Sequence, residues 1–324
     1  MAENPSDCRR LRAVFMGTPE FSLGALDALA AADFVDVVLA VTRPDAVSGR
    51  GKKLVPSPVK ARALELGLPV FETKSLRGPE AQERLREASA DVFCVAAYGA
   101  ILPPEVLEMP PLGCLNVHAS LLPAGRGAAP MQRDLLEGRP RLGYSIMRIE
   151  EGLDTGPYCL QGSVEVGERV YGEVSAELSA LGGEALVQVL RTLACGGDPG
   201  WVEQDDALAT HADKLSKAEV LLSPTEGAAA NMRRVQASSD AAPARAVVAG
   251  RPLRVMRAHV PGPGEVAGES PQAGEVAVAQ RRLFIGCADG PLELLEVKPD
   301  GKRAMAAAEF AAGIHSDDAH WEAI

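Results

Sequence analysis

The chain has 324 residues, of which 47% are hydrophobic, and a formal net charge of −11. Its length suits two domains, and no apolar run approaches the roughly 20 residues that are needed to span a bilayer. An acidic chain is not expected to bind nucleic acid over its whole surface, so any such contact depends on a local basic patch.

The N-terminal stretch MAENPSDCRRLR lacks the apolar core of a secretory signal. The six cysteines are scattered without a CxxC pair, a distribution that argues against a zinc site and against a disulfide framework. We therefore expect a protein of the reducing cytoplasm, with a cytoplasmic location.

Apolar strands alternate with helices through the first part of the chain. We expect Thr18 to cap the first helix, Ser57 to cap the second and Gly67 to end it. The alternation predicts right-handed βαβ units and an α/β domain with a Rossmann-like, doubly wound parallel sheet. The absence of a GxGxxG motif argues against a dinucleotide site. The expected strands are 12–17, 35–42, 70–72, 92–97, 114–118, 144–148 and 158–166, and the later helices are 79–89, 130–137 and 172–193.

The run GGDPG at 196–200 is the clearest break in the chain. We expect a first domain at 1–197, a linker at 198–217 and a second domain at 218–324. In the second domain a helix at 224–234 precedes short strands with Gly and Asp turns, a pattern that predicts a small β-barrel. These strands are expected at 246–248, 253–258, 275–279, 283–287 and 292–297.

Polar side chains interrupt the apolar strand that ends at His118. Because side chains alternate along a strand, Asn116, His118 and Ser120 share one face. A strand inside a parallel sheet is normally apolar on both faces, but polar groups are expected where its carboxyl end meets a ligand. The alternative is that Asn116 and His118 are core polar groups with internal partners.

Asp154 lies between two glycines in GLDTGP, directly after another apolar strand. Taken alone it suits a turn residue whose side chain bonds to nearby backbone N–H groups. Together with Asn116 and His118 it completes a donor, an acid/base group and an orienting carboxylate. This set suits the attack of an amine on a carbonyl carbon.

The motifs NVHASLLP, GRGAAPMQ and EEGLDTG resemble those of the folate-dependent formyltransferase family. The motifs MGTPEFS, GRGKKL, VAAYGAILP and ADGPLELLEVKPDGKRAM agree with the family in order and spacing. The resemblance covers nearly the whole chain and is strongest in its first half. Within the family, the motifs are most similar to those of members that formylate the amino group of methionyl-tRNA.

The resemblance implies that 10-formyltetrahydrofolate is the cosubstrate, that no metal takes part, and that the second domain is an OB-like barrel that binds tRNA. It implies catalytic roles for Asn116, His118 and Asp154. It also implies that the partner is initiator methionyl-tRNA and that the protein acts in translation initiation. We expect no association with membranes, and we expect the chain to be a monomer. The implied folate-binding residues are Tyr98, Ser120, Leu121, Leu122 and Pro123, and the implied tRNA-binding residues are Arg43, Arg50, Lys52 and Lys53.

Two alternatives remain open at this point. A formyltransferase that acts on an amino-sugar nucleotide would share the same three polar residues, and a folate- or RNA-binding protein with faded activity would share the fold. Three departures from the family bear on RNA affinity: Ala46 replaces a common Arg, Ala124-Gly125 replaces Arg-Trp, and the stretch 238–244 lacks Asn-Pro-Trp-Pro.

Overall fold

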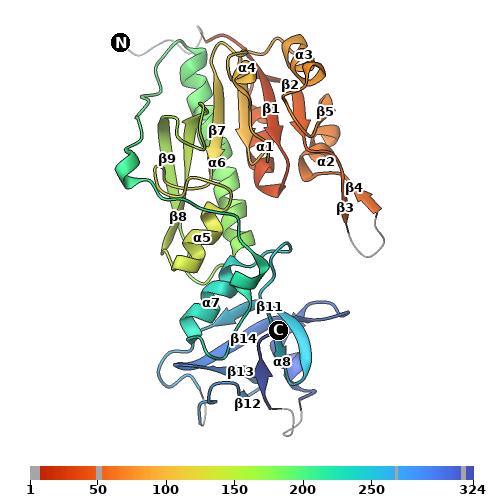
Figure 1. Cartoon of the computed structure of the whole chain (residues 1–324), viewed down its shortest axis with the longest axis vertical. Helices are drawn as coiled ribbons and strands as arrows, with labels where there is room; N and C mark the ends of the chain where they lie inside the picture. Colours follow the sequence, from red (N-terminus) through yellow and green to blue (C-terminus); the bar gives the residue numbers. More distant parts are fainter. Residues whose placement is uncertain (1–7, 49–52, 267–268, 315–318) are drawn as a thin grey trace. The chain divides into compact units, whose positions relative to one another are not determined.

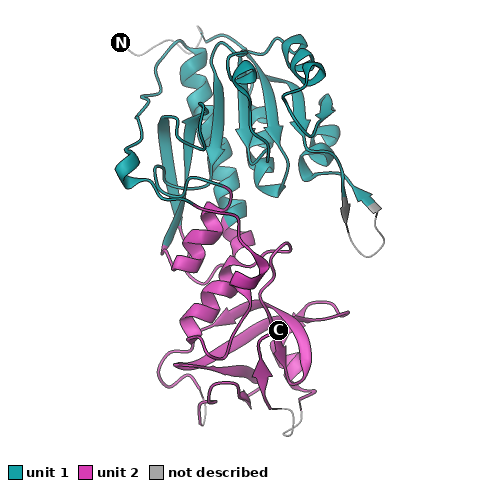
Figure 2. Cartoon of the chain, in the orientation of Figure 1, with its two compact units in different colours: residues 1–127, 141–164, 175–211 teal, residues 128–140, 165–174, 212–324 magenta. Residues whose placement is uncertain are grey.

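The computed structural model describes residues 8–48, 53–266, 269–314 and 319–324. The chain divides into two compact units (Figure 2). Among the described residues, no helix combines the length and the apolar character needed to cross a membrane. Unit 1 comprises 1–127, 141–164 and 175–211, and unit 2 comprises 128–140, 165–174 and 212–324.

Unit 1 is built on a seven-stranded sheet (Figure 1). Its first five strands in spatial order run parallel, and β8 runs antiparallel to β7. The order reverses between β1 and β6, and the carboxyl ends of strands beside such a switch point are where open α/β sheets bind ligands. From one edge to the other the strands are β5 (Val70–Glu72), β2 (Val35–Thr42), β1 (Leu11–Gly17), β6 (Val92–Ala96), β7 (Cys114–His118), β8 (Arg141–Arg148) and β9 (Tyr158–Glu165).

Helices cover both faces of this sheet. Side chains of α3 (Pro79–Glu87) and α4 (Pro104–Leu107) share a buried cluster with Val14 and Met16 of β1. On the other face, Gly182 of α6 (Tyr171–Ala194) lies so close to Val117 that an added Cβ would be 2.5 Å from its Cγ1. The predicted Rossmann-like, doubly wound sheet is therefore confirmed.

The first helical turns differ from the prediction at Thr18. The chain forms a short 3-10 turn (Glu20–Ser22) and then α1 (Leu23–Ala31), and Thr18 caps neither. Its hydroxyl donates instead to the carbonyl of Tyr98, 2.9 Å away. The prediction that Thr18 caps the first helix was wrong, because its hydroxyl bonds to a distant carbonyl rather than to the backbone of the helix.

Ser57 does cap α2 (Pro58–Glu65), since its Oγ accepts from Lys60 N at 3.1 Å. Gly67, just beyond that helix, has a φ of 70° and ends it as predicted. Between β2 and α2 the chain adds a hairpin of β3 (Ala46–Ser48) and β4 (Lys53–Val55), which extends away from the sheet (Figure 1). No strand was expected here, because the sequence pattern of 43–53 indicated only an exposed loop.

A disulfide joins Cys8 to Cys195, with their Cα atoms 4.1 Å apart. The end of α6 returns to the start of the chain, where Arg9 N donates to the Ala194 carbonyl at 3.1 Å. The scattered cysteines argued against a disulfide framework, and this disulfide departs from that expectation, because the two residues are 187 positions apart and only the fold brings them together.

Unit 2 contains an antiparallel, nearly closed barrel. Its strands follow the order β12-β13-β14-β11-β10-β16, and β15 pairs with β14. The barrel approaches closure where Trp321 N donates to Gly274 O at 2.7 Å and Glu275 forms a bridge with His320. The strands are β10 (Arg245–Val248), β11 (Arg251–His259), β12 (Val276–Ala279), β13 (Arg282–Cys287), β14 (Gly290–Pro299), β15 (Met305–Ala306) and β16 (Trp321–Glu322).

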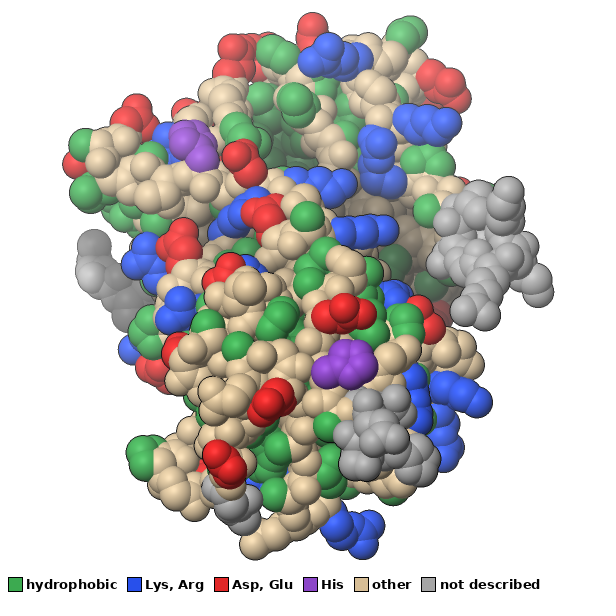
Figure 3. All heavy atoms as spheres, turned by 60° about the horizontal axis from the view of Figure 1, so that its bottom comes forward, with side chains coloured by type: hydrophobic (Ala, Val, Ile, Leu, Met, Phe, Trp, Pro, Cys, Tyr) green, Lys and Arg blue, Asp and Glu red, His purple; other side chains and the backbone are tan. Residues whose placement is uncertain are grey.

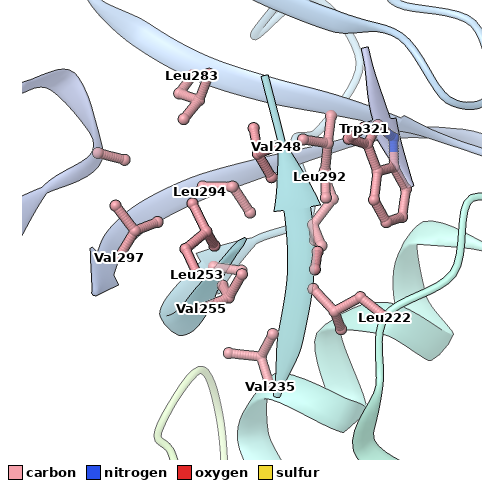
Figure 4. Packing of buried hydrophobic residues seen from close by; sticks show 14 of the residues in the cluster. Leu222, Val235, Val248, Leu253, Val255, Leu283, Leu292, Leu294, Val297 and Trp321 are labelled. Atoms are coloured by element: carbon pink, nitrogen blue, oxygen red, sulfur yellow. The ribbon is translucent and has the colours of Figure 1, made fainter. Parts of the chain in front are cut away.

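The barrel closes around a buried apolar cluster (Figure 4). Val248, Leu292 and Trp321 meet inside it, and Val235 contributes from α7 (Ala228–Ala237). The unit also contains α5 (Pro130–Glu137) and α8 (Ala307–Ala311), and α5 packs against α7. The small barrel predicted for this part of the chain is confirmed.

Candidate active site

Strand β7 presents His118 at its carboxyl end, as the alternation predicted. The imidazole is buried, and its Nε2 lies 2.9 Å from the carbonyl oxygen of Gly125. Because a carbonyl oxygen only accepts hydrogen bonds, Nε2 must carry a hydrogen. The other ring nitrogen, Nδ1, faces the carboxylate of Asp154, with 3.8 Å between Nδ1 and Oδ1.

Asp154 is held in a backbone conformation that L-residues rarely adopt. Its φ is 54°, in the left-handed region, between Gly152 and Gly156. Its Oδ2 accepts a hydrogen bond from the backbone N–H of Gly127 at 2.9 Å. A strained backbone that points a carboxylate at an imidazole is typical of functional sites.

Asn116 lies two residues before His118 on the same face of β7, and its side chain is half-buried. Its carboxamide forms no hydrogen bond with any other described residue. The amide can therefore donate to a ligand without breaking an internal bond. The structure thus brings His118 and Asp154 face to face and leaves the Asn116 donor available at the same end of the strand.

The SLLP turn that follows β7 is fixed by Ser145 of β8. The Ser145 hydroxyl donates to Ser120 O at 2.6 Å and accepts from Leu122 N at 3.0 Å. Gln161 donates to Leu122 O at 2.9 Å, and the Leu122–Pro123 peptide is cis. Since these backbone groups have internal partners, the turn offers a ligand chiefly the side chain of Leu121, which is 41% exposed.

Tyr98 follows β6 at the same edge of the sheet, but its ring lies in the buried cluster that lines one face. Its hydroxyl is buried and has no hydrogen-bond partner among the described residues. Burial raises the pKa of this phenol to about 12. The backbone that follows Tyr98, where Gly99 has a φ of 79°, lies at the same strand end.

The residues expected to contact tRNA belong to a different part of unit 1. Arg43 lies just before the β3–β4 hairpin, and its guanidinium donates to the carbonyl of Lys74. Arg50 and Lys52 lie outside the described residues, and Lys53 begins β4 without a described side chain. Within the described ranges, no group of three or more His, Cys, Asp and Glu side chains is arranged to hold a metal ion.

A further set of polar side chains supports the site from the stretch 198–217, which was expected to be a linker. Gln204 donates to the carbonyl of Asp154, and Arg126 donates to the side chains of both Gln204 and Asp206. Arg126 is buried despite its charge. A buried arginine needs partners, so Arg126 within GRG was the one signal in the sequence that could have led to this group.

Family models match both parts of the chain. The formyl transferase model matches residues 11–190, and the formyl transferase C-terminal domain model matches residues 214–315. The chain belongs to the formyl transferase family. This places the polar groups of β7 and the Asp154 loop within the domain that the first model describes.

Similar proteins extend over both units of this formyl transferase. A protein of Methylococcus capsulatus named methionyl-tRNA formyltransferase is 42% identical over 301 residues, which cover 93% of this chain and 96% of the relative. One of Neisseria meningitidis with the same name is 41% identical over 308 residues, which cover 94% and 98%.

Solved structures show the same fold at low sequence identity. HypX of Aquifex aeolicus in complex with tetrahydrofolic acid has a TM-score of 0.59 and 15% identity, over 94% of this chain and 48% of HypX. The sugar 3N-formyl transferase WlaRD has a TM-score of 0.62 and 12% identity, over 91% of this chain and 100% of WlaRD. At these identities the likeness concerns the fold alone.

Proposed function

We propose that this formyl transferase moves the formyl group of 10-formyltetrahydrofolate to the free amino group of initiator methionyl-tRNA, which yields formylmethionyl-tRNA and tetrahydrofolate. The observation that carries this assignment is the relation to methionyl-tRNA formyltransferases of 40% to 42% identity over 93% to 94% of the chain. The relation includes the barrel as well as the sheet.

In this proposal Asn116, His118 and Asp154 carry the chemistry. The amine must be neutral to attack the formyl carbon, and negative charge then develops on the formyl oxygen. Asn116 has an unused amide donor at the strand end for that oxygen. Asp154 accepts the proton that the amine loses, directly or through His118 Nδ1, which faces the carboxylate at 3.8 Å.

The folate supplies the formyl group on its N10 nitrogen. When the bond between the formyl carbon and N10 breaks, N10 takes up the proton that the amine has lost, and tetrahydrofolate leaves. We assign its binding to Tyr98 and to the turn formed by Ser120, Leu121, Leu122 and Pro123. Because the backbone of the turn already has internal hydrogen bonds and the Leu121 side chain is exposed, the turn suits apolar packing against a ring system of the folate better than hydrogen bonding to it. In this assignment Tyr98 acts through its backbone, because its ring is occupied in the core.

The acceptor end of the tRNA is assigned to the β3–β4 hairpin, through Arg43, Arg50, Lys52 and Lys53. The barrel of unit 2, which we equate with the tRNA-binding domain at 218–324, adds contacts. Acidic and basic side chains are interspersed on the face shown in Figure 3, so RNA affinity depends on particular cations rather than on a uniformly basic surface. The domain boundaries at 197 and 217, the monomeric state and the cytoplasmic location stay predictions.

An acceptor comparison tests this function. The purified full chain, supplied with 10-formyltetrahydrofolate, should formylate methionyl-tRNA with a far higher kcat/KM than an amino-sugar nucleotide. Uncharged tRNA serves as the control that lacks the amine. A preference for the sugar would instead support the second candidate, a formyltransferase that acts on an amino-sugar nucleotide. Tight folate binding without transfer to either acceptor would support a protein with faded activity.

A further inference from the structure

The carboxamide of Gln204 joins the two loops that surround the His118–Asp154 pair. Its Nε2 lies 2.8 Å from the carbonyl oxygen of Asp154 and 2.6 Å from that of Gly156. An amide nitrogen has two hydrogens, so Gln204 donates one to each carbonyl. Its Oε1 accepts from Arg126 Nε at 2.9 Å. These three bonds fix the orientation of the amide, because a flipped amide would place its oxygen against two carbonyl oxygens.

The loop at 125–127 receives its support from the same segment. The backbone N–H of Gly125 donates to Thr210 Oγ1 at 2.8 Å, and that of Arg126 donates to Thr210 O at 2.9 Å. The Arg126 guanidinium also pairs with Asp206, with 2.8 Å between Nη2 and Oδ1. Residues 204–210 therefore contact both loops.

The loop at 125–127 contacts both proposed catalytic side chains directly, and the other loop carries one of them, Asp154. The Gly125 carbonyl accepts from His118 Nε2, and the Gly127 N–H donates to Asp154 Oδ2. A displacement of either loop would therefore change the distance between the imidazole and the carboxylate. That distance, 3.8 Å between Nδ1 and Oδ1, is already longer than a hydrogen bond, so no direct hydrogen bond fixes the imidazole and the carboxylate relative to each other.

The left-handed backbone of Asp154 makes this support necessary. A φ of 54° at a residue with a Cβ persists only where the surroundings hold it. The bonds from Gln204 to the carbonyls of Asp154 and Gly156 fix the backbone on the C-terminal side of Asp154. Without them the loop can relax toward a commoner conformation, and the carboxylate would turn away from His118.

We propose that Gln204 is a positioning residue for formyl transfer, which keeps the Asp154 carboxylate facing His118 and couples the Asp154 loop to the loop at 125–127 through Arg126. The inference rests on the proposed function, in which His118 and Asp154 act on the amine. Gln204 itself does not touch the substrate.

Two variants separate this role from a general structural one. Gln204→Leu removes all three bonds, whereas Gln204→Glu keeps an acceptor for Arg126 and replaces only the donors to the two carbonyls. Gln188→Glu is the matched control, since Gln188 is exposed on α6 in the same unit and gains the same charge. All are measured as folded full-length chains, with kcat, KM for each substrate and circular dichroism.

We expect both Gln204 variants to lose kcat by up to about 100-fold, as is typical of a small misplacement of reacting groups, with KM for folate nearly unchanged. The control should keep its kcat. In a double-mutant cycle with Asp154→Asn, the Gln204 substitution should cost little further rate, because the group that it positions has already been lost.

The outcomes distinguish the two proposals. If Asp154→Asn alone leaves kcat unchanged, the proposed catalytic role is wrong, and the positioning role falls with it. If Asp154→Asn lowers kcat but the Gln204 variants keep native turnover, or add their full loss to that of Asp154→Asn, the positioning role alone is overturned. If both Gln204 variants fail to fold, Gln204 stabilises the fold rather than the site, and the inference is also overturned.

Discussion

Replacing Asp154 with Asn keeps the shape of the side chain that faces His118 and removes its charge. The Asn oxygen can still accept the bond that Gly127 N now donates to Oδ2 at 2.9 Å. The Asn nitrogen then takes the place of Oδ1, 3.8 Å from His118 Nδ1. Because His118 Nε2 already donates to Gly125 O, its Nδ1 presents a lone pair, which in the variant faces an amide that cannot take up a proton.

The variant therefore loses the base that accepts the amine proton, and its imidazole cannot relay a proton through Nδ1. Acid–base groups of this kind contribute roughly 10²- to 10⁴-fold to a rate. At about 1.36 kcal/mol for each factor of ten, this corresponds to about 2.7 to 5.4 kcal/mol of transition-state stabilisation. We expect kcat to fall within this range.

Folate affinity should be nearly unchanged in Asp154→Asn, since the SLLP turn is fixed by Ser145 and Gln161 rather than by Asp154. The assay pairs steady-state formylation of methionyl-tRNA with an equilibrium titration of folate. The reasoning is refuted if kcat and folate affinity fall together, because Asp154 would then be a folate ligand or a turn residue.

His118→Ala should reduce kcat by roughly 10²- to 10⁴-fold while circular dichroism stays native; aggregation of the variant would show a structural histidine instead. Asp134→Asn tests a half-buried carboxyl, whose pKa is raised to about 6 by its partial burial. Ionisation of this carboxyl destabilises the native protein as pH rises through 6. The free energy of unfolding of the variant should therefore exceed that of native protein by about 1 to 2 kcal/mol at pH 7.5 and equal it at pH 4. Urea titrations at both pH values test this. Ala46→Arg should raise kcat/KM on methionyl-tRNA about ten- to a hundredfold without changing folate binding, since it restores a forked cation on the hairpin; no gain, together with a severe loss in Arg43→Ala, would show that Arg43 has taken over the contact.

Local patterns predicted the sheet well. The apolar run at 35–42 became β2 with the expected bounds, and the alternation around Val117 placed Asn116 and His118 on one face of β7. These features follow from side-chain periodicity, which the sequence displays directly. The pairing of His118 with Asp154 needed the family resemblance, since 36 positions separate them in the sequence.

Elements that depend on tertiary pairing could not be predicted. Strands β15 and β16 contain two residues each and exist only through their partners in the barrel. Gln204 was assigned to a polar linker, because its bonds to the Asp154 loop leave no periodic signal. Thr18 likewise satisfied the local pattern of a helix cap, but its hydroxyl bonds to Tyr98 O in the folded chain.

The most direct test of the central claim is a single-turnover measurement with the full chain in excess over methionyl-tRNA and saturating 10-formyltetrahydrofolate. We predict that each methionyl-tRNA becomes formylmethionyl-tRNA with one tetrahydrofolate released, and that the chain with Asn116, His118 and Asp154 all replaced by Ala yields almost none. The account is contradicted if native protein releases tetrahydrofolate without formylating the tRNA, or if the triple variant forms the product as fast as native protein.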